Sequence, residues 1–315
     1  MRRILLIRLG AMGDIIHALP AAAALGSAPH THLTWLVEPK WRSLLEGSGA
    51  ANQLLELNRR DLLPSLRALR EKSFHLIIDL QGLIKSALAA FASRSPRRLG
   101  YAYPQLREKP AGVFYTQRIL TTSPHIVDRH LEIARAAGAP SQPARFPLPD
   151  GAPEGDLPSQ PFVLANPHAG WISKQWPLQR YAELARLLDA QLRMPLVLNC
   201  SPAGAPQLKS VPGVHLHVSS LAGLIHATRR ATAVVGVDSG PLHLAAALGL
   251  PGVAIFGPTD PARNGPYGQS IAVLRSPTAA TTYKRIPETL PCMQNISATR
   301  VFELLQSKLA ATLPN

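Results

Sequence analysis

The sequence predicts an α/β protein of two domains, each with a parallel β-sheet flanked by helices. Short all-apolar runs such as residues 4–7 are typical of strands buried on both faces of a sheet. These runs alternate with helical patterns, as a parallel sheet requires. Residues 139–161 interrupt the alternation with so many Pro and Gly residues that no helix or central strand can continue. We interpret this stretch as a linker between domains at 1–150 and 160–315.

The elements follow in order along each predicted domain. In the first, a strand, a helix, two strands and a helix are predicted at residues 4–7, 14–25, 31–38, 75–80 and 85–92. In the second, strands and helices are predicted at residues 161–167, 178–192, 195–200, 219–230, 233–238, 241–249, 252–257 and 299–312. The pattern leaves open whether the last helix packs back on the first domain. Open α/β sheets bind ligands at the carboxyl ends of their strands, so a cleft between two such edges is expected.

The amino-acid composition limits the classes of protein to which the chain can belong and the kind of partner that it can bind. The 315 residues include 33 Lys and Arg against 19 Asp and Glu, a formal net charge of +14 that favours an anionic partner. Aromatic residues make up 5%, few for a protein that stacks on nucleic-acid bases. Cys200 and Cys292 are too few for a disulfide scaffold. Apolar runs are too short for a membrane span, and Arg8 and Asp14 interrupt any signal-like stretch, so we expect a cytoplasmic protein.

Basic residues are concentrated in the stretch 85–118, where Glu108 is the single acid. This stretch is either a solvated basic face or a docking surface for an anionic acceptor. Its basic residues are Lys85, Arg94, Arg97, Arg98, Arg107, Lys109 and Arg118.

A glycine-containing turn with Gly10 and Gly13 follows the first strand and opens a helix. Asp14 at this point fits either a helix N-cap or a catalytic base. Glu38 stands at the end of the second strand, where dinucleotide-binding folds place an acid for the ribose. The glycine spacing does not match G-x-G-x-x-G, which makes a nicotinamide dehydrogenase the weakest of the readings.

Lys174 lies in a loop after a strand, flanked by Trp171 and Trp176. A lysine supplies a point charge for a phosphate oxygen, and the tryptophans could order it. The alternative is a surface lysine beside a tryptophan, Trp176, that packs at the start of a helix.

The most specific segment begins where a buried strand ends at Asp238. Ser239 and Gly240 form a tight turn, and Pro241 fits the first position of the next helix. The free backbone N–H groups and the helix dipole would then form an anion site suited to a sugar-nucleotide diphosphate. His243 lies about one turn into the helix. The alternative is a capped core helix without a ligand.

A further strand-end loop contains Gly257 and Pro258 and either closes over a nucleotide or is a simple turn. The sequence lacks D-x-D, a phosphate-binding P-loop, a G-x-S-x-G elbow and H-E-x-x-H. We therefore expect chemistry that needs no metal and no cofactor, with Lys174 and a helix N-terminus as its electrophilic groups.

Taken together, these segments resemble the lipopolysaccharide heptosyltransferases of glycosyltransferase family 9. The resemblance covers nearly the whole chain, and the QGLIKSA and REKPAG segments favour the type I branch. Eight segments carry it in order: MGDIIHALPA, IIDLQGLIKSALAA (77–90), REKPAGVFY (107–115), HIVDRH (125–130), SKQWP (173–177), VGVDSGPLHLAAALG (235–249), FGPTDP (256–261) and CMQNIS (292–297).

The resemblance implies a GT-B fold of two Rossmann-like domains, with the acceptor on the first and the nucleotide-sugar on the second. It implies transfer of L-glycero-D-manno-heptose from ADP-heptose to the Kdo of Kdo2-lipid A, with inversion. Such an acceptor is an anionic glycolipid, so peripheral contact with the cytoplasmic face of the inner membrane is also expected.

Roles for individual residues follow from the same resemblance. Asp14 matches the general base, and Lys174 matches a lysine that contacts the donor phosphates and assists catalysis. The residues expected at the donor, with Lys174, are Asp238, Ser239, Gly240, His243, Gly257 and Pro258. The residues expected at the acceptor are Gly13, Arg59, Arg60, Gln81, Lys85 and Arg107.

One departure bears on the nucleotide. The family usually has an acid for the ribose after the strand at 195–199, whereas residues 200–210 contain none. The alternatives to this function are another family 9 transferase, either of the heptosyltransferase II or III type or with another nucleotide-sugar donor, a GT-B-like sugar-nucleotide epimerase, and a noncatalytic nucleotide-sugar binding protein.

Overall fold

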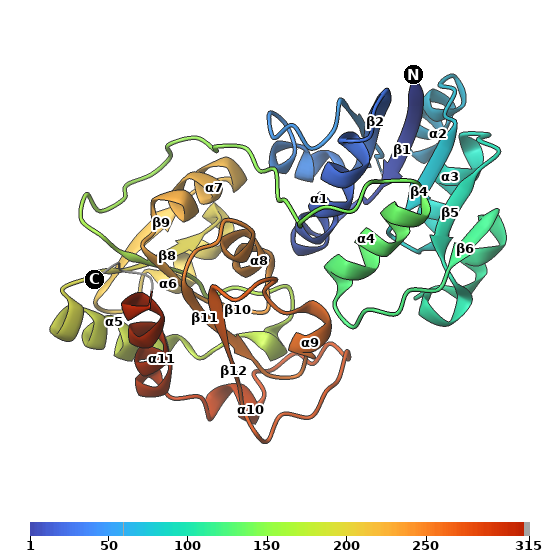
Figure 1. The fold of residues 1–315 in the computed structure, drawn as a ribbon. Coiled ribbons are helices and arrows are strands. Elements are labelled where there is room, and N and C mark those ends of the chain that lie inside the picture. The colour runs from blue at the N-terminus through green and yellow to red at the C-terminus, as the bar shows by residue number, and fades with distance from the viewer. Residues whose placement is uncertain (59, 312–315) are drawn as a thin grey trace. The chain divides into compact units, whose positions relative to one another are not determined.

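The structure is a computed structural model that describes residues 1–58 and 60–311. The chain divides into two compact units, Met1–Pro149 and Asp150–Asn315 (Figure 1). Each unit contains one six-stranded sheet in which all neighbouring strands run parallel. Helices and short 3-10 turns connect the strands, as parallel pairing requires.

The sheet of the first unit has the strand order β3-β2-β1-β4-β5-β6. The chain moves outward from β1 in one direction and then returns to build the other half, so the order reverses between β1 and β4. Its strands are β1 (Arg2–Ile7), β2 (Thr31–Val37), β3 (Gln53–Glu56), β4 (Leu76–Asp79), β5 (Arg98–Tyr101) and β6 (Gln117–Ile119). Its helices are α1 (Met12–Gly26), α2 (Leu62–Arg70), α3 (Ile84–Ala92) and α4 (Ile126–Ala136), with 3-10 turns η1 (Pro39–Leu44), η2 (Tyr103–Gln105) and η3 (Lys109–Phe114).

Strand β1 forms the centre of the first unit because its apolar residues, Ile4 to Ile7, are fully buried. Ile7 is level with Leu36 of β2 and with Asp79 of β4. The residues that follow these three positions therefore emerge at one edge of the sheet. Helix α1 crosses from this edge and packs against α4.

The second unit repeats the arrangement with the order β12-β11-β10-β7-β8-β9. Here the order reverses between β7 and β10. The strands are β7 (Val163–Asn166), β8 (Leu196–Cys200), β9 (Val214–Val218), β10 (Ala233–Val237), β11 (Gly252–Phe256) and β12 (Ile271–Arg275). The helices are α5 (Leu178–Leu192), α6 (Ala205–Leu208), α7 (Leu221–Arg230), α8 (Gly240–Ala247), α9 (Pro261–Asn264), α10 (Pro291–Gln294) and α11 (Ala298–Ala310), with 3-10 turns η4 (Ile172–Lys174) and η5 (Pro202–Gly204).

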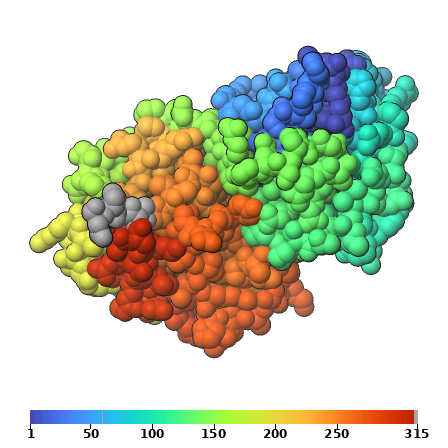
Figure 2. All heavy atoms as spheres, viewed as in Figure 1, coloured from blue at the N-terminus to red at the C-terminus, as the bar shows by residue number. Residues whose placement is uncertain are grey.

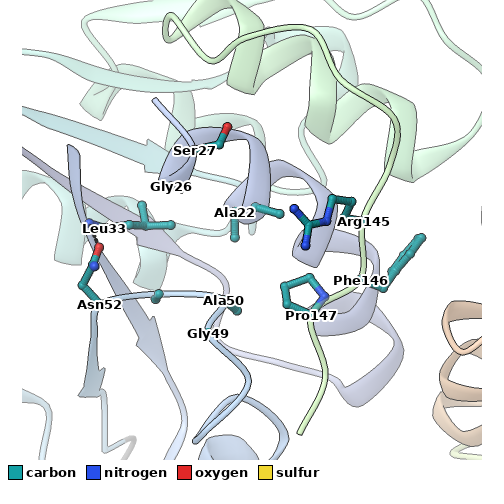
Figure 3. A pocket seen from close by; sticks show the side chains of 12 residues that line it. Ala22, Gly26, Ser27, Leu33, Gly49, Ala50, Asn52, Arg145, Phe146 and Pro147 are labelled. Atoms are coloured by element: carbon teal, nitrogen blue, oxygen red, sulfur yellow. Dashed lines mark hydrogen bonds between the residues drawn. The ribbon is translucent and has the colours of Figure 1, made fainter. Parts of the chain in front are cut away.

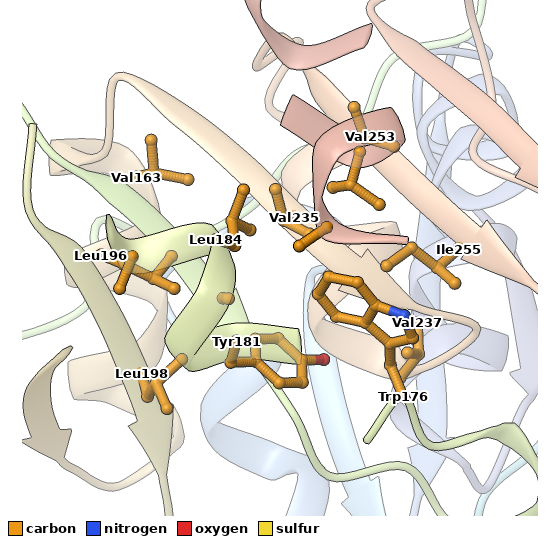
Figure 4. Close-up of a cluster of buried hydrophobic side chains, with 14 of the residues drawn as sticks. Val163, Trp176, Tyr181, Leu184, Leu196, Leu198, Val235, Val237, Val253 and Ile255 are labelled. Atoms are coloured by element: carbon orange, nitrogen blue, oxygen red, sulfur yellow. The ribbon is translucent and has the colours of Figure 1, made fainter. Parts of the chain in front are cut away.

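The larger core of the second unit lies between its sheet and helices α5 and α11 (Figure 4). Trp176 anchors it, because its ring meets Tyr181 edge-on at 4.9 Å and its Nε1 donates to the carbonyl of Ile296 at 2.9 Å. Trp176 therefore packs at the start of α5. Helix α11 packs on α5 and on β10, β11 and β12, within the second unit.

The structure contains elements that the apolar pattern did not predict. Strands β3, β5, β6, β9 and β12, together with α2 and α4, add to the predicted set. Residues 140–162 contain no helix or strand, in agreement with the Pro-rich pattern. In the part of the chain that the structure describes, no helix is long and apolar enough to cross a membrane.

Candidate active site

In the first unit, polar side chains gather where β1, β2 and β4 end. Arg8 directly follows β1, is nearly buried, and lies with its Nη2 2.7 Å from Oδ1 of Asp14. The same guanidinium donates from Nη1 to the carbonyl of Leu80, just beyond β4. Arg8 therefore joins the ends of two central strands to the first turn of α1.

Asp14 is the third residue of α1, not its N-cap as one reading of the sequence held. The N-cap is Ala11, and Oδ2 of Asp14 accepts from its backbone N–H at 3.1 Å. The helix starts two residues earlier than expected, so the carboxylate lies inside the first turn, where the helix dipole favours it. Its side chain is 45% exposed, which leaves it accessible to an acceptor hydroxyl.

Glu38 does not present a free acid, as a ribose-binding role would need. Its carboxylate is buried and lies 3.5 Å from Nζ of Lys85 and 3.8 Å from Nζ of Lys40. Lys85 is thereby held over the end of β2. Gln81 is fixed in the same region because its Oε1 accepts from the N–H of Leu9 at 3.0 Å.

Asp79 is a third acid at this edge, after Asp14 and Glu38, and sequence reasoning assigned it no role. It is fully buried, and burial raises its pKa, although Tyr115 Oη donates to it at 2.7 Å. It also accepts from the N–H groups of Gln81 and Gly82 at 2.8 and 3.2 Å. Asp79 therefore shapes the turn that carries Gln81.

The other residues expected at the acceptor differ in their surroundings. Gly13 is buried within α1. Arg60 and Arg107 are exposed and follow β3 and β5, so both lie past the carboxyl ends of strands. Arg59 lies outside the described residues.

In the second unit, three polar side chains converge on Asp238, which follows β10. Its Oδ2 lies 2.6 Å from Nζ of Lys174 and accepts from Thr259 Oγ1 at 2.7 Å. Its Oδ1 lies 3.5 Å from Nε2 of His243. Lys174 follows β7, Thr259 follows β11, and His243 lies in the first turn of α8 after β10. The cluster therefore sits at the reversal of strand order.

Asp238 stays ionised although it is almost completely buried. Burial by itself would raise its pKa, but the hydrogen bond with His243 and the charge of Lys174 outweigh this and lower the pKa well below its usual range. The buried carboxylate therefore holds the ammonium of Lys174 in a fixed position.

Lys174 has a second neighbour in Trp171. The Lys174 Nζ lies 4.3 Å from the centre of the Trp171 ring, and the guanidinium of Arg285 lies 5.6 Å from the centre of the same ring. A cation over an indole ring is stabilised by the ring quadrupole. Of the two flanking tryptophans, Trp171 orders the lysine, whereas Trp176 packs in the core.

Helix α8 begins beside this cluster with Ser239 as its N-cap. The Ser239 side chain does not cap the helix, and its Oγ is buried without a hydrogen-bond partner among the described residues. The N-terminal N–H groups of a helix attract anions. Lys174, the Ser239 hydroxyl and this helix end are thus hydrogen-bond donors grouped around the start of α8.

Gly257 and Pro258 are buried at the end of β11. A Cβ on Gly257 would lie 2.5 Å from Sδ of Met293, so the glycine is needed for close packing. The Pro258 carbonyl accepts from the N–H of Thr282 at 2.7 Å. Both residues position the loop that delivers Thr259 to Asp238.

Comparison with known proteins decides the family. The model of glycosyltransferase family 9 (heptosyltransferase) matches residues 64–294. The chain belongs to this family. It is 30% identical over 298 residues to lipopolysaccharide heptosyltransferase 1 of Pseudomonas aeruginosa, with 85% of this chain and 82% of that protein covered. It is 28% identical over 312 residues to the Escherichia coli K12 protein of the same name, with 87% and 94% covered.

Solved structures agree with this assignment. The Escherichia coli heptosyltransferase WaaC with ADP superposes with a TM-score of 0.79 at 25% identity, over 97% of this chain and 99% of that one. Escherichia coli heptosyltransferase II gives a TM-score of 0.80 at 24% identity, over 99% of each chain, and supports the fold. The GT-B prediction is therefore confirmed, and the chain is a family 9 heptosyltransferase.

The segment of this heptosyltransferase that lacks the usual acid has a compact structure. Gln207 lies in α6 and its Oε1 is 3.2 Å from Nε2 of His168. A Cβ on Gly204 would lie 2.6 Å from the same imidazole. Two polar groups without a carboxylate, His168 and Gln207, thus stand near the end of β8.

A cavity of about 450 Å³ lies elsewhere in the first unit (Figure 3). It opens between the end of α1, the start of β2 and residues 145–147, and Arg145 is its single charged lining residue. None of its lining residues is among the predicted site residues. Across residues 1–58 and 60–311, no group of three or more His, Cys, Asp and Glu side chains could hold a metal ion.

Sequence reasoning did not single out several of these contributors. Arg8 and Thr259 each follow a buried strand within a polar segment, and Thr259 lies in the FGPTDP segment that carried the resemblance. Their position directly after a buried strand could therefore have marked them as candidate site residues. Arg285 lies far from any strand end, and only the folded chain brings it to Trp171.

Proposed function

We propose that this heptosyltransferase transfers L-glycero-D-manno-heptose from ADP-heptose to the Kdo of Kdo2-lipid A, with inversion at the anomeric carbon. The relatives named lipopolysaccharide heptosyltransferase 1 and the WaaC structure with ADP support this donor and acceptor. The observation that carries the proposal is the Lys174–Asp238 pair at the start of α8, because it matches the chemistry of a leaving diphosphate.

On the donor side, negative charge develops on the β-phosphate as the bond between phosphate oxygen and anomeric carbon breaks. Lys174 and the N-terminal N–H groups of α8 would stabilise that charge, since both are preorganised donors. These groups supply the positive charge that a metal supplies in other transferases. The reaction is accordingly proposed to need neither metal nor cofactor.

On the acceptor side, Asp14 would remove the proton of the attacking hydroxyl. The oxygen then forms a bond to the anomeric carbon, on the face opposite the phosphate, and the bonding pair of the leaving group stays on ADP. Arg8 holds the carboxylate 2.7 Å away, so Asp14 needs little reorganisation to reach the hydroxyl. Lys85, Arg60 and Arg107 would meet the carboxylates and phosphates of the acceptor.

The test is release of ADP from ADP-heptose, measured with and without Kdo2-lipid A and in the presence of EDTA. Release that needs the acceptor and survives EDTA is the expected result. Loss of activity in EDTA, restored by a divalent cation, would contradict metal independence. Release of ADP without any acceptor would contradict transfer to Kdo2-lipid A.

A different family 9 transfer is the second candidate, favoured by one observation. Gln207, paired with His168, stands in the segment where the family usually has an acid for the ribose. The chain is also 30% identical over 239 residues to lipopolysaccharide heptosyltransferase 2 of Salmonella typhimurium, 66% of this chain. A panel of nucleotide-sugars, and an acceptor that already carries one heptose, would separate the two candidates.

A further inference from the structure

Exposed apolar side chains gather on one side of the first unit, over α3, η2 and η3. Phe91 is 55% exposed, Val113 is 66% exposed and Tyr103 is 41% exposed. Phe114 packs beside Phe91, with ring centres 5.7 Å apart. In Figure 2 the teal to green spheres belong to this part of the first unit.

Arginines tie these rings into one patch. The Arg98 guanidinium lies 5.6 Å from the Phe91 ring and its Nε donates to the carbonyl of Phe114 at 2.7 Å. Arg118 lies 5.1 Å from the Tyr103 ring and donates to the carbonyl of Gly112 at 3.0 Å. We call this set the aromatic–arginine patch; its members are Phe91, Arg98, Tyr103, Val113, Phe114 and Arg118.

The charge in the stretch that carries the patch is mostly positive. Glu108 is the single acid of residues 85–118, and its Oε2 accepts from the N–H of Ile84 at 2.7 Å, at the start of α3. Arg94, Arg97 and Lys109, in the same stretch of the chain, are exposed as well. An exposed apolar surface framed by cations matches the interface of an anionic bilayer, where aromatic rings and arginines both find favourable positions.

We propose that the aromatic–arginine patch docks this heptosyltransferase on an anionic lipid bilayer. This inference rests on the proposed function, in which the acceptor is a lipid held in such a bilayer. A second copy of the chain fits the surface poorly, because contact between the patches of two copies would bring two sets of cations together. Side chains at a membrane can bury their apolar parts while the charged ends stay with the headgroups.

The position of the patch suits delivery of the acceptor. Helix α3 begins three residues after Gln81 and contains both Lys85, in its first turn, and Phe91, in its last turn. Gln81 and Lys85 are expected at the acceptor. At 1.5 Å per residue, Ile84 and Phe91 are about 10 Å apart along the helix. A lipid headgroup near Phe91 would therefore lie about 10 Å from the carboxyl edge of the sheet, a distance that one or two sugar rings can span.

The first experiment is flotation of the purified full chain with vesicles of phosphatidylcholine, with or without phosphatidylglycerol. We expect binding to the anionic vesicles that weakens as salt is raised. Phe91→Ser combined with Val113→Ser should reduce the partition coefficient about tenfold. The matched control is Val273→Ser, at an exposed valine of the second unit, and it should bind as the unsubstituted chain does.

A second variant changes only a charge, and it tests the patch even if the double serine variant fails to fold. Lys109→Glu removes no apolar contact, and it should also weaken binding to anionic vesicles about tenfold. Equal binding by the patch variants and Val273→Ser would overturn the proposal. So would a chain that dimerises in solution and becomes monomeric on Phe91→Ser with Val113→Ser, because the patch would then be a self-interface.

An assay of turnover separates this inference from the proposed function. With an acceptor stripped of its acyl chains and free in solution, the patch variants should keep the kcat/KM of the unsubstituted chain. With the acceptor in anionic vesicles, their KM should rise about tenfold at unchanged kcat. An equal loss with both acceptors would place the patch in the acceptor site and overturn its assignment to the bilayer. Vesicle binding that depends on the patch, from a chain without any transfer, would contradict the function and leave the docking surface standing.

Discussion

Arg8 and Asp14 form an ion pair of 2.7 Å that connects the end of β1 to the first turn of α1. The arginine side chain is 8% exposed and the aspartate side chain is 45% exposed. Arg8 also donates to the carbonyl of Leu80 beyond β4. The accessible carboxylate is thus oriented by a nearly buried cation that the sheet itself holds.

Replacing the carboxylate tests its role as a base. Asp14→Asn keeps the shape of the side chain but removes the proton acceptor, so kcat should fall by a factor of about 10² to 10⁴. Affinity for ADP-heptose, measured by calorimetry, should change little because the donor is assigned to the other unit. Turnover close to that of the unsubstituted chain would remove Asp14 from the mechanism.

Replacing the arginine tests positioning separately from chemistry. Arg8→Met fills similar volume without the charge and leaves Asp14 free to rotate. We expect a lower kcat with an unchanged KM for ADP-heptose, and partial recovery in Arg8→Lys, which restores the charge without the two-pronged geometry. A melting temperature that drops while kcat stays normal would mean that Arg8 acts in folding alone.

On the donor side, Lys174→Ala should weaken binding of ADP-heptose and ADP. The loss of a charge-assisted hydrogen bond of about 1.5–3 kcal/mol corresponds to a rise in Kd of about 10- to 150-fold. Lys209→Ala, at an exposed lysine of the same unit, is the matched control. If both variants bind the donor equally, Lys174 has no part in phosphate binding.

Thr259 offers a test of the Asp238 cluster. Thr259→Val keeps the shape of this buried residue but removes the hydroxyl that donates to Asp238 at 2.7 Å. A buried carboxylate that loses a donor should cost about 1–3 kcal/mol of stability, whereas Thr259→Ser should retain most of it. Thermal unfolding of both variants gives the comparison, and equal melting temperatures would show that the hydroxyl is dispensable.

Buried His130 predicts an acid-sensitive first unit. Burial, and then the charge of Arg8, lower its pKa to about 3, while its Nδ1 lies 3.0 Å from the carbonyl of His17. An unfolded histidine has a pKa near 6.5, so below that pH the unfolded chain binds the additional proton. Its contribution is complete above pH 6.5 and falls by up to about 1.4 kcal/mol per pH unit toward pH 3.

The measurement is the melting temperature of the unsubstituted chain and of His130→Gln at pH 7.5 and pH 5.5. Glutamine can still donate to the His17 carbonyl but does not titrate, so the drop between the two pH values should be smaller in the variant. Identical drops in the two proteins would show that other groups cause the acid sensitivity.

The central strands were predictable from sequence because both their faces are buried. Residues 4–7 and 233–237 are continuous apolar runs. A short run of this kind fits few structures other than a buried strand. Strands at the sheet edges, such as β3 and β6, combine short length with exposed polar residues, and their apolar signal is correspondingly weak. The contacts of β3 with β2 and of β6 with β5 come from tertiary pairing.

For the side chains of the candidate site, too, the sequence showed which segment each belongs to, whereas the contacts between them depend on the fold. That Lys174 and Asp238 belong to strand-end loops could be read from the sequence, but their 2.6 Å pairing depends on β7 and β10 being neighbours. Glu38 shows the opposite case. Its position matched a ribose-binding acid, and its buried pairing with Lys85 became visible only in the fold.

Both sheets reverse their strand order at the same relative point, between the first and fourth strand of each unit. Each unit therefore carries its own hydrophobic core and its own cluster of polar groups, without borrowing strands from the other. In evolutionary terms, such halves can diverge at separate rates. Under the proposed roles, substitutions around Asp238 would change the nucleotide-sugar while the surroundings of Asp14 stay constant. Recombination between relatives at the Pro149–Asp150 boundary would then exchange donor preference as a single inherited block.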